Sequence, residues 1–301
     1  KTIFKIADQA STPITTMESL CKFWKSLKGK KLQSITADDL EDAHRVALRI
    51  ISKSKSENVG IMSFYESIFP EVLKSCVNEE GKLDPPILLY YRGNLDVLKK
   101  PGIAVIGTRE PTRNGILAGK HFSGEFAKRG YNIVSGLAIG CDTTGHQGAL
   151  AVGGATTAFL ANGLDWDSIY PKENLDLAKE IVVKEGLLLS EYPVGQSCGR
   201  YGLVARDRLQ AGLSYATVIV QTGVKGGTMH AVNATIQSKK PLFAVEYKTD
   251  EDTSNEKVQG NIKLVKEQKA YALRSTGIDD ACSIIEKAHK IINTVQQQSL
   301  F

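Results

Sequence analysis

Basic side chains follow a series of short apolar runs in the middle of this chain. The runs are residues 103–106, 131–134, 156–160, 187–189, 216–220 and 241–245, and most of them lead through a loop into a helix-like segment. The loops and helix starts after them carry six cations, which are Arg109, Lys172, Arg200, Arg206, Arg208 and Lys225. No nucleophile–base pair and no metal-ligand spacing accompanies these cations. The pattern therefore predicts a protein that holds phosphates rather than one that cleaves bonds.

The loop after the first run reads Gly107-Thr108-Arg109. Glycine lets the backbone approach a ligand closely, and the planar guanidinium of arginine can bind a phosphate through two hydrogen bonds. We therefore expect Arg109 to contact a phosphate, although a surface arginine in an ordinary ion pair is the alternative.

The loop after the second run could also hold an anion. It contains the small residues Ser135, Gly136 and Gly140. Free N–H groups at a helix start favour an anion, whereas the carboxylate of Asp142 at the same place would repel one. Asp142 is therefore expected to cap the helix, to orient Arg109 or to accept a hydrogen bond from a ligand hydroxyl. His146, one turn later, is expected to be a packed structural residue more often than a catalytic one.

The later loops add further candidates. Lys172 could reach a backbone phosphate, while Arg200 and Tyr201 could supply a charge and a ring that stacks on a base. Arg206 and Arg208 would be about 200° apart on a helix. Both can face one ligand only if they lie at the helix start.

The loop after the fifth run is the second predicted anion site. Lys225, Gly226, Gly227 and Thr228 would lie at a helix N-terminus, where backbone N–H groups and the helix dipole favour a phosphate. The loop lacks the spacing of a P-loop, and no G-x-G-x-x-G follows the first run. A dinucleotide-dependent dehydrogenase is therefore disfavoured.

The elements that position these loops form an α/β pattern. Runs rich in Val and Ile alternate with predicted helices at residues 115–129, 142–152, 174–185, 203–213 and 227–238. Such alternation predicts a mostly parallel sheet with helices on both faces, and ligands of such sheets bind at the carboxyl ends of the strands. We expect a helical N-terminal domain over residues 1–58, an α/β domain over 59–273 with a lead-in at 59–101, and a C-terminal helix and tail over 274–301.

Two details refine these boundaries. Thr36 with Asp39 has the shape of a capping box, which predicts that a helix begins after Thr36. Residues 248–258 are polar and charged, and they predict an exposed excursion.

Composition sets the class of protein. The chain has 301 residues, 42% of them hydrophobic, and a net charge of +5, which is compatible with nucleic acid or other anions as partners. Its five scattered cysteines predict reduced thiols in a cytosol. No apolar stretch approaches the roughly 20 residues of a membrane span. We expect a cytoplasmic protein without a membrane segment.

In their order along the chain, these loops resemble the motifs of the DNA-processing protein A family (DprA, also called Smf). The resemblance covers residues 60–273. Its motifs are FPEVL at 69–73, DPPILLYYRG at 84–93, IAVIGTR at 103–109, SGLAIGCD at 135–142, HQGAL at 146–150, NGLD at 162–165, YPKEN at 170–174, SEYP at 190–193, RDRLQAGLS at 206–214, KGGT at 225–228, FAV at 243–245 and GNIKL at 260–264.

The resemblance implies a Rossmann-like domain that binds and protects single-stranded DNA, loads the RecA recombinase during natural transformation, and commonly dimerises. It implies no catalysis and no cofactor. By this resemblance Arg109 would sit in the phosphate pocket, and Arg206 would contribute to a positively charged surface. Asp207 replaces the asparagine that the family places between its two arginines, which lowers the local positive charge.

The last residues carry a separate signal. Gln297-Gln-Ser-Leu-Phe301 resembles the pentapeptide with which bacterial proteins bind the DNA sliding clamp. In that mode Leu300 and Phe301 would enter an apolar pocket, while Gln297 and Ser299 complete the motif. A frayed tail is the alternative.

Two other functions stay open. A nucleotide phosphoribohydrolase of the lysine decarboxylase-like group would use a similar fold, but its catalytic glutamate is missing from residues 224–233. A nucleotide-binding sensor that signals through the N-terminal helices is the other alternative.

Overall fold

The computed structural model describes residues 9–10, 14–28 and 34–298, without the side chains of residues 200–201 and 291–298. The chain divides into two compact units, residues 1–57 and residues 58–301. In the described parts of the chain, each helix is too short or too polar to cross a lipid bilayer.

The N-terminal unit contains two helices, α2 (Met17–Ser26) and α4 (Ala37–Ser56). The predicted capping box is confirmed at the start of α4. The hydroxyl of Thr36 accepts a hydrogen bond from the Asp39 backbone N–H at 3.2 Å, and the Asp39 carboxylate accepts one from the Thr36 backbone N–H at 2.8 Å. These bonds satisfy two N–H groups that the first turn leaves free, and thereby fix where the helix begins.

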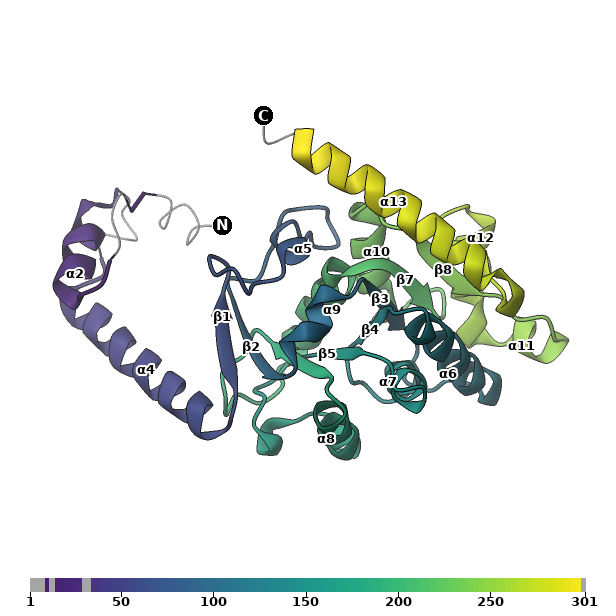
Figure 1. The fold of residues 1–301 in the computed structure, drawn as a ribbon, viewed down its shortest axis with the longest axis horizontal. Coiled ribbons are helices and arrows are strands. Elements are labelled where there is room, and N and C mark those ends of the chain that lie inside the picture. Colours follow the sequence, from purple (N-terminus) through teal and green to yellow (C-terminus); the bar gives the residue numbers. More distant parts are fainter. Residues whose placement is uncertain (1–8, 11–13, 29–33, 299–301) are drawn as a thin grey trace. The chain divides into compact units, whose positions relative to one another are not determined.

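The second unit is built on one sheet of nine strands in the order β1-β2-β6-β5-β4-β3-β7-β8-β9 (Figure 1). The strands β3 to β9 run parallel to one another, whereas β2 is antiparallel to both β1 and β6. The bounds are β1 (Gly60–Ser63), β2 (Leu88–Gly93), β3 (Gly102–Ile106), β4 (Asn132–Ser135), β5 (Thr156–Leu160), β6 (Leu187–Ser190), β7 (Ser214–Ile219), β8 (Leu242–Val245) and β9 (Tyr271–Leu273). The predicted mostly parallel sheet is confirmed.

Helices connect the parallel strands and cover both faces of the sheet. The α-helices of this unit are α5 (Glu71–Lys74), α6 (Arg113–Lys128), α7 (Cys141–Ala151), α8 (Leu175–Val183), α9 (Arg200–Leu213), α10 (Thr228–Gln237), α11 (Asp250–Ser254), α12 (Gln259–Lys266) and α13 (Ile278–Gln298). Short 3₁₀ turns are η1 (Leu95–Lys99), η2 (Trp166–Ser168), η3 (Lys172–Asn174), η4 (Glu256–Val258) and η5 (Ser275–Gly277).

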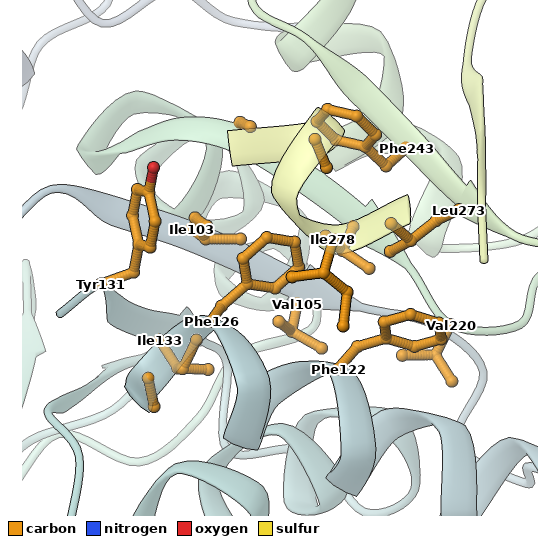
Figure 2. Close-up of a cluster of buried hydrophobic side chains, with 14 of the residues drawn as sticks. Ile103, Val105, Phe122, Phe126, Tyr131, Ile133, Val220, Phe243, Leu273 and Ile278 are labelled. Atoms are coloured by element: carbon orange, nitrogen blue, oxygen red, sulfur yellow. The ribbon is translucent and has the colours of Figure 1, made fainter. Parts of the chain in front are cut away.

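The core lies on both sides of the sheet because successive strand side chains point to opposite faces. In β3, Ile103 and Val105 pack with residues of α6 and α13, and Figure 2 shows them beside Phe122, Phe126 and Ile278. The alternating residues Ala104 and Ile106 pack against α10 and α12 on the other face. This two-sided burial explains why the strands read as nearly continuous apolar runs.

Glycines set the distance between α6 and α7, which lie side by side (Figure 1). A Cβ atom at Gly119 would lie 2.1 Å from the Thr144 hydroxyl oxygen, and one at Gly148 would lie 2.4 Å from the Lys120 carbonyl oxygen. Side chains at these positions would push the helices apart. The close packing places the N-terminus of α7 against the loop after β3.

The expectation of an exposed excursion at residues 248–258 is correct only in part, because most of these residues are exposed but the segment is ordered and anchored. The segment forms α11 and η4, and Asp252 and Val258 are buried. Thr249 caps α11 by accepting the Asp252 N–H at 3.1 Å, and the Asp252 carboxylate accepts a hydrogen bond from Asn114 of α6 at 2.8 Å. Polar side chains order this segment through caps and buried hydrogen bonds, which apolar periodicity does not reveal.

Candidate nucleic-acid interface

A pocket of about 420 Å³ opens at the carboxyl ends of β3 and β7. The chain leaves β3 toward β4, β5 and β6 on one side and returns to pair β7 on the other, so the strand order reverses here. Loops diverge at such a reversal and leave a crevice between them. The pocket is lined by residues 106–109, 138, 142, 203, 204, 206, 207, 210, 222, 223, 225–228 and 231. The structure thus brings together Gly107, Thr108, Arg109, Asp142, Arg206, Lys225, Gly226, Gly227 and Thr228.

The loop after β3 is anchored on two sides. The Thr108 N–H donates to the Gln221 carbonyl at 2.8 Å, and the Thr108 carbonyl accepts from the Cys141 N–H at 3.0 Å. Gly107 must lack a side chain, because a Cβ atom there would lie 2.5 Å from the Cys141 sulfur. This anchoring leaves Arg109 exposed at the mouth of the pocket.

The N-terminus of α10 forms the opposite wall. Gly226 has φ 139°, a backbone conformation that favours glycine, and the N-cap Gly227 gives the helix no side-chain cap. The Thr228 N–H at the start of α10 makes no hydrogen bond among the described residues and is available to a ligand, whereas the N–H groups of Met229 and His230 donate to the carbonyls of Gly226 and Gly227 at 3.1 Å. Lys225 is exposed beside them, and neither Lys225 nor Arg109 takes part in an ion pair within the described parts of the chain.

Asp142 forms part of the floor, and the expectation that it caps α7 is wrong. The N-cap is Gly140, with φ 86°, and Asp142 lies inside the helix. Its carboxylate instead accepts the N–H groups of Gly136 at 3.1 Å and Ala138 at 3.2 Å. Burial raises the pKa of the Asp142 carboxyl, and the nearby guanidinium of Arg206 opposes that change.

Arg206 is a floor residue and not part of an exposed charged surface, contrary to the expectation. Its side chain is 7% exposed, and Nη1 donates to the Phe159 carbonyl at 2.8 Å. The guanidinium lies 3.7 Å from a carboxylate oxygen of Asp142 and 3.7 Å from one of Asp207. Gly136 makes room for it, since a Cβ atom there would lie 2.3 Å from the guanidinium carbon. The floor therefore places one buried guanidinium between two carboxyl groups, and removal of this arginine would leave both acids without their nearest cation.

The neighbouring positions on α9 diverge as the predicted helical angle requires. Arg208 pairs with Glu191 at 2.8 Å and with Asp84 at 2.7 Å, away from the pocket. Asp207 lines the pocket, and burial raises the pKa of its carboxyl to about 7. The aspartate at position 207 therefore places a carboxyl group in the pocket itself.

The sequence of residues 60–286 matches the family model described as DNA recombination-mediator protein A. The chain belongs to this family. DNA processing protein DprA of Bacillus subtilis is 30% identical over 241 residues, which cover 75% of this chain and 78% of that protein. Protein Smf of Synechocystis is 39% identical over 170 residues, or 55% of this chain, and the chain spans only 42% of the length of that relative.

Two solved structures of the family agree with the fold. DNA processing protein A from Streptococcus pneumoniae superposes with a TM-score of 0.73 at 26% identity, covering 93% of this chain and 91% of that one. The protein from Helicobacter pylori, whose structure was described for its single-stranded DNA binding mode, gives a TM-score of 0.59 at 27% identity, covering 80% and 96%.

Asn261 has a structural role next to the pocket. The buried Asn261 amide donates to the carbonyls of Val220 at 2.9 Å and Val245 at 3.1 Å, and its oxygen accepts the Thr222 N–H at 2.9 Å. Asn261 thus ties the ends of β7 and β8 to α12. These bonds fix the loop that leads to Lys225.

Several predicted site residues do not line the pocket. Ser135 is buried and donates to the Val105 carbonyl at 2.6 Å, so it links β4 to β3. Gly136 and Gly140 shape the floor and the start of α7. Lys172 is exposed outside the pocket and donates to the Asp167 carbonyl. The side chains of Arg200, Tyr201 and Gln297, and residues Ser299, Leu300 and Phe301, lie outside the described residues.

His146 is fully buried below the floor. Its Nδ1 is 2.7 Å from the Thr156 hydroxyl, and burial lowers the pKa of the imidazole to about 3. A neutral histidine at this depth has no access to a ligand. In the described parts of the chain, no group of three or more His, Cys, Asp or Glu side chains could hold a metal ion.

Sequence reasoning missed two polar residues of the pocket, Gln210 and Thr222. Gln210 lies four residues after Arg206 on α9, and this helical spacing would have placed both on one face. Thr222 directly follows the β7 region and precedes the glycine-rich loop. Its position at the end of a parallel strand is the signal that could have identified it.

Proposed function

We propose that this protein binds single-stranded DNA through the pocket between β3 and β7. The proposal rests on one observation. Two exposed cations, Arg109 and Lys225, lie at the same opening as the N-terminus of α10, which has no side-chain cap. Phosphates are stabilised both by arginine and lysine and by free N–H groups at a helix start. The DNA binding described for the Helicobacter pylori relative supports the same assignment.

We further propose that the bound DNA is handed to a recombinase rather than chemically altered. Membership of the recombination-mediator family supports this role. The hydroxyls beside these two acid–base groups, Ser135 next to Asp142 and Thr156 next to His146, are fully buried and donate to backbone carbonyls, so neither is placed to attack a ligand. The protein would protect single-stranded DNA and load RecA on it during natural transformation and recombination.

The proposed assembly includes a homodimer and contact with the sliding clamp through residues 297–301. Light scattering of the full chain tests the dimer, and a monomer at micromolar concentration would contradict it.

Clamp binding predicts that removal of residues 297–301 abolishes capture on immobilised clamp and leaves DNA affinity unchanged.

The DNA-binding proposal predicts that Arg109→Ala and Lys225→Ala each weaken binding of a labelled oligothymidine. The loss should be about tenfold at low salt, and each variant should reduce the slope of log affinity against log salt by about 1, because one phosphate contact disappears. Fluorescence anisotropy across a salt series measures both quantities.

Lys179→Ala is the matched control, since Lys179 is an exposed cation on α8 outside the pocket. If the control and the pocket variants lose the same amount of affinity, binding depends on the net positive charge of the protein and not on the pocket. The same oligonucleotide then tests the mediator role. RecA filaments should form faster on DNA bound by the wild-type protein than on bare DNA, and Arg109→Ala should give no such increase.

A further inference from the structure

The rim of the pocket is basic, whereas its floor is acidic. Arg109 and Lys225 lie exposed at the opening, and Asp142 and Asp207 line the interior beside Arg206. A phosphate placed at the floor would meet two carboxyl groups and only one guanidinium. The phosphates are therefore expected at the rim, and a different part of the nucleotide must face the floor.

The floor also holds polar atoms without partners. Gln210 is 2% exposed and Arg206 is 6% exposed, and both line the pocket. The Gln210 side-chain oxygen and the Arg206 Nε have no hydrogen-bond partner in the described parts of the chain. Buried polar groups are nearly always paired. Unpaired groups in the floor point to a polar ligand, or to water that such a ligand displaces.

Asp207 is positioned to accept a hydrogen bond from that ligand. Its Oδ1 accepts from the Gln210 amide at 3.1 Å and lies 3.7 Å from Arg206 Nε. No hydrogen bond to Oδ2 is present among the described residues, and the side chain retains 15% exposure in the pocket wall. An ionised carboxylate only accepts hydrogen bonds, so its partner must be a donor.

We propose that Asp207 selects the nucleobase that enters the pocket and favours guanine over thymine. This inference rests on the proposed binding of single-stranded DNA. Guanine presents a ring N–H and an adjacent amino group on one edge, and both can donate to a carboxylate. Thymine presents one N–H between two carbonyl oxygens, which a carboxylate repels. A site built to accept hydrogen bonds discriminates strongly against a partner that cannot supply them.

The charge of Asp207 sets the pH at which this selection operates. Four charged or titratable groups act on it from the surrounding elements, which are Arg206 of α9, Asp142 of α7, His230 of α10 and Arg109 of the loop after β3. Burial outweighs the opposing effects of Arg206, His230 and Arg109 and raises the pKa of Asp207 to about 7. The preference for guanine should therefore strengthen as the pH rises through this range.

The test uses the full-length wild-type protein and three short oligothymidines. The central position is thymine, guanine or hypoxanthine, which lacks the amino group of guanine. At about pH 8 we expect the guanine oligomer to bind about tenfold more tightly than all-thymine, with hypoxanthine between them. Competition anisotropy gives the ratios, and equal affinity for the three oligomers would overturn the inference.

Asp207→Asn provides the second arm, with Asp280→Asn on the exposed side of α13 as the matched charge control. Asp207→Asn should abolish the guanine preference and strengthen binding of all-thymine DNA, because the floor loses its negative charge. Retention of the preference in this variant would also overturn the inference. If wild type binds no oligomer, the proposed DNA-binding function fails as well, whereas tight binding without discrimination removes only the role of Asp207.

Discussion

Asp207 is a destabilising residue as well as a pocket residue. The pKa of its carboxyl is raised from 3.8 to about 7 because burial disfavours the charged form. The folded protein therefore binds this proton more tightly than the unfolded chain does. The folded state loses stability as the pH rises from the unfolded pKa to the folded one, and the loss is complete above about pH 7.

This sign predicts the pH profile of Asp207→Asn. The variant should melt at the same temperature as wild type near about pH 4 and at a higher temperature above about pH 7, by roughly 3 °C or more. The melting temperature rises because the substitution removes a buried charge, while the asparagine side chain keeps the shape of the aspartate. Thermal melts at a series of pH values measure the difference, and Asp280→Asn should show no gain above about pH 7, because its carboxylate is exposed in the first turn of α13 and favourable there. A difference that does not vary with pH would show that packing, not ionisation, determines the effect.

Arg206 illustrates what residue patterns do not reveal. Its place in the motif at residues 206–214 predicted that it is a charged residue of the site. Its position on the pocket floor is consistent with that prediction. Its burial against Phe159 depends on Gly136, which lies 70 positions earlier in the chain. A contact between such distant segments has no local signature, so a surface position was expected.

At the scale of elements, α6 and α7 pack through glycines that are unfavourable within an isolated helix. Glycine in a helix interior costs about 0.5–1 kcal/mol relative to alanine. Gly119 and Gly148 persist because a Cβ atom at either position would meet atoms of the other helix at 2.1 Å or 2.4 Å. The close contact between the two helices outweighs the low helix propensity of each glycine.

Gly148→Ala should therefore destabilise the protein although alanine is the better helix former. Separation of α7 from the Lys120 carbonyl is expected to cost about 1–3 kcal/mol net. Gly277→Ala is the control, because a Cβ atom there meets no other atom within 4 Å. Urea titration measures the free energy of unfolding of both variants. A Gly148→Ala protein as stable as the control would mean that the helices adjust without cost.

The elements that sequence predicts best are those with a simple physical signature. Each central strand is buried on both faces, so an apolar run identified it, and the amphipathic helices α4 and α13 carried an apolar stripe. Asn174 occupies the N-cap position of α8, yet its side chain makes no cap hydrogen bond, and its amide donates to the Leu137 carbonyl and the Thr143 hydroxyl. The pocket loops were predictable as strand ends, whereas the hydrogen bonds within them were not.

At the scale of the whole molecule, the pocket and its supporting core lie entirely within residues 58–301. This unit has its own two-sided core, so it should fold without the N-terminal helices. We predict that a protein of residues 58–301 binds oligothymidine within about twofold of the full chain. Anisotropy compares the two, with circular dichroism as the check on folding. A large loss of affinity in a folded fragment would assign part of the DNA site to residues 1–57.

The two hydrogen bonds of Thr108 have a kinetic consequence. They fix the backbone of the loop after β3 to β7 and α7 in the protein without ligand. The conformational entropy of this loop is therefore lost on folding rather than on DNA binding, and only long side chains such as Arg109 remain to be immobilised. A preorganised site of this kind needs no slow rearrangement before capture. Association should be limited by diffusion and steered by charge, so salt should act mainly through the on-rate.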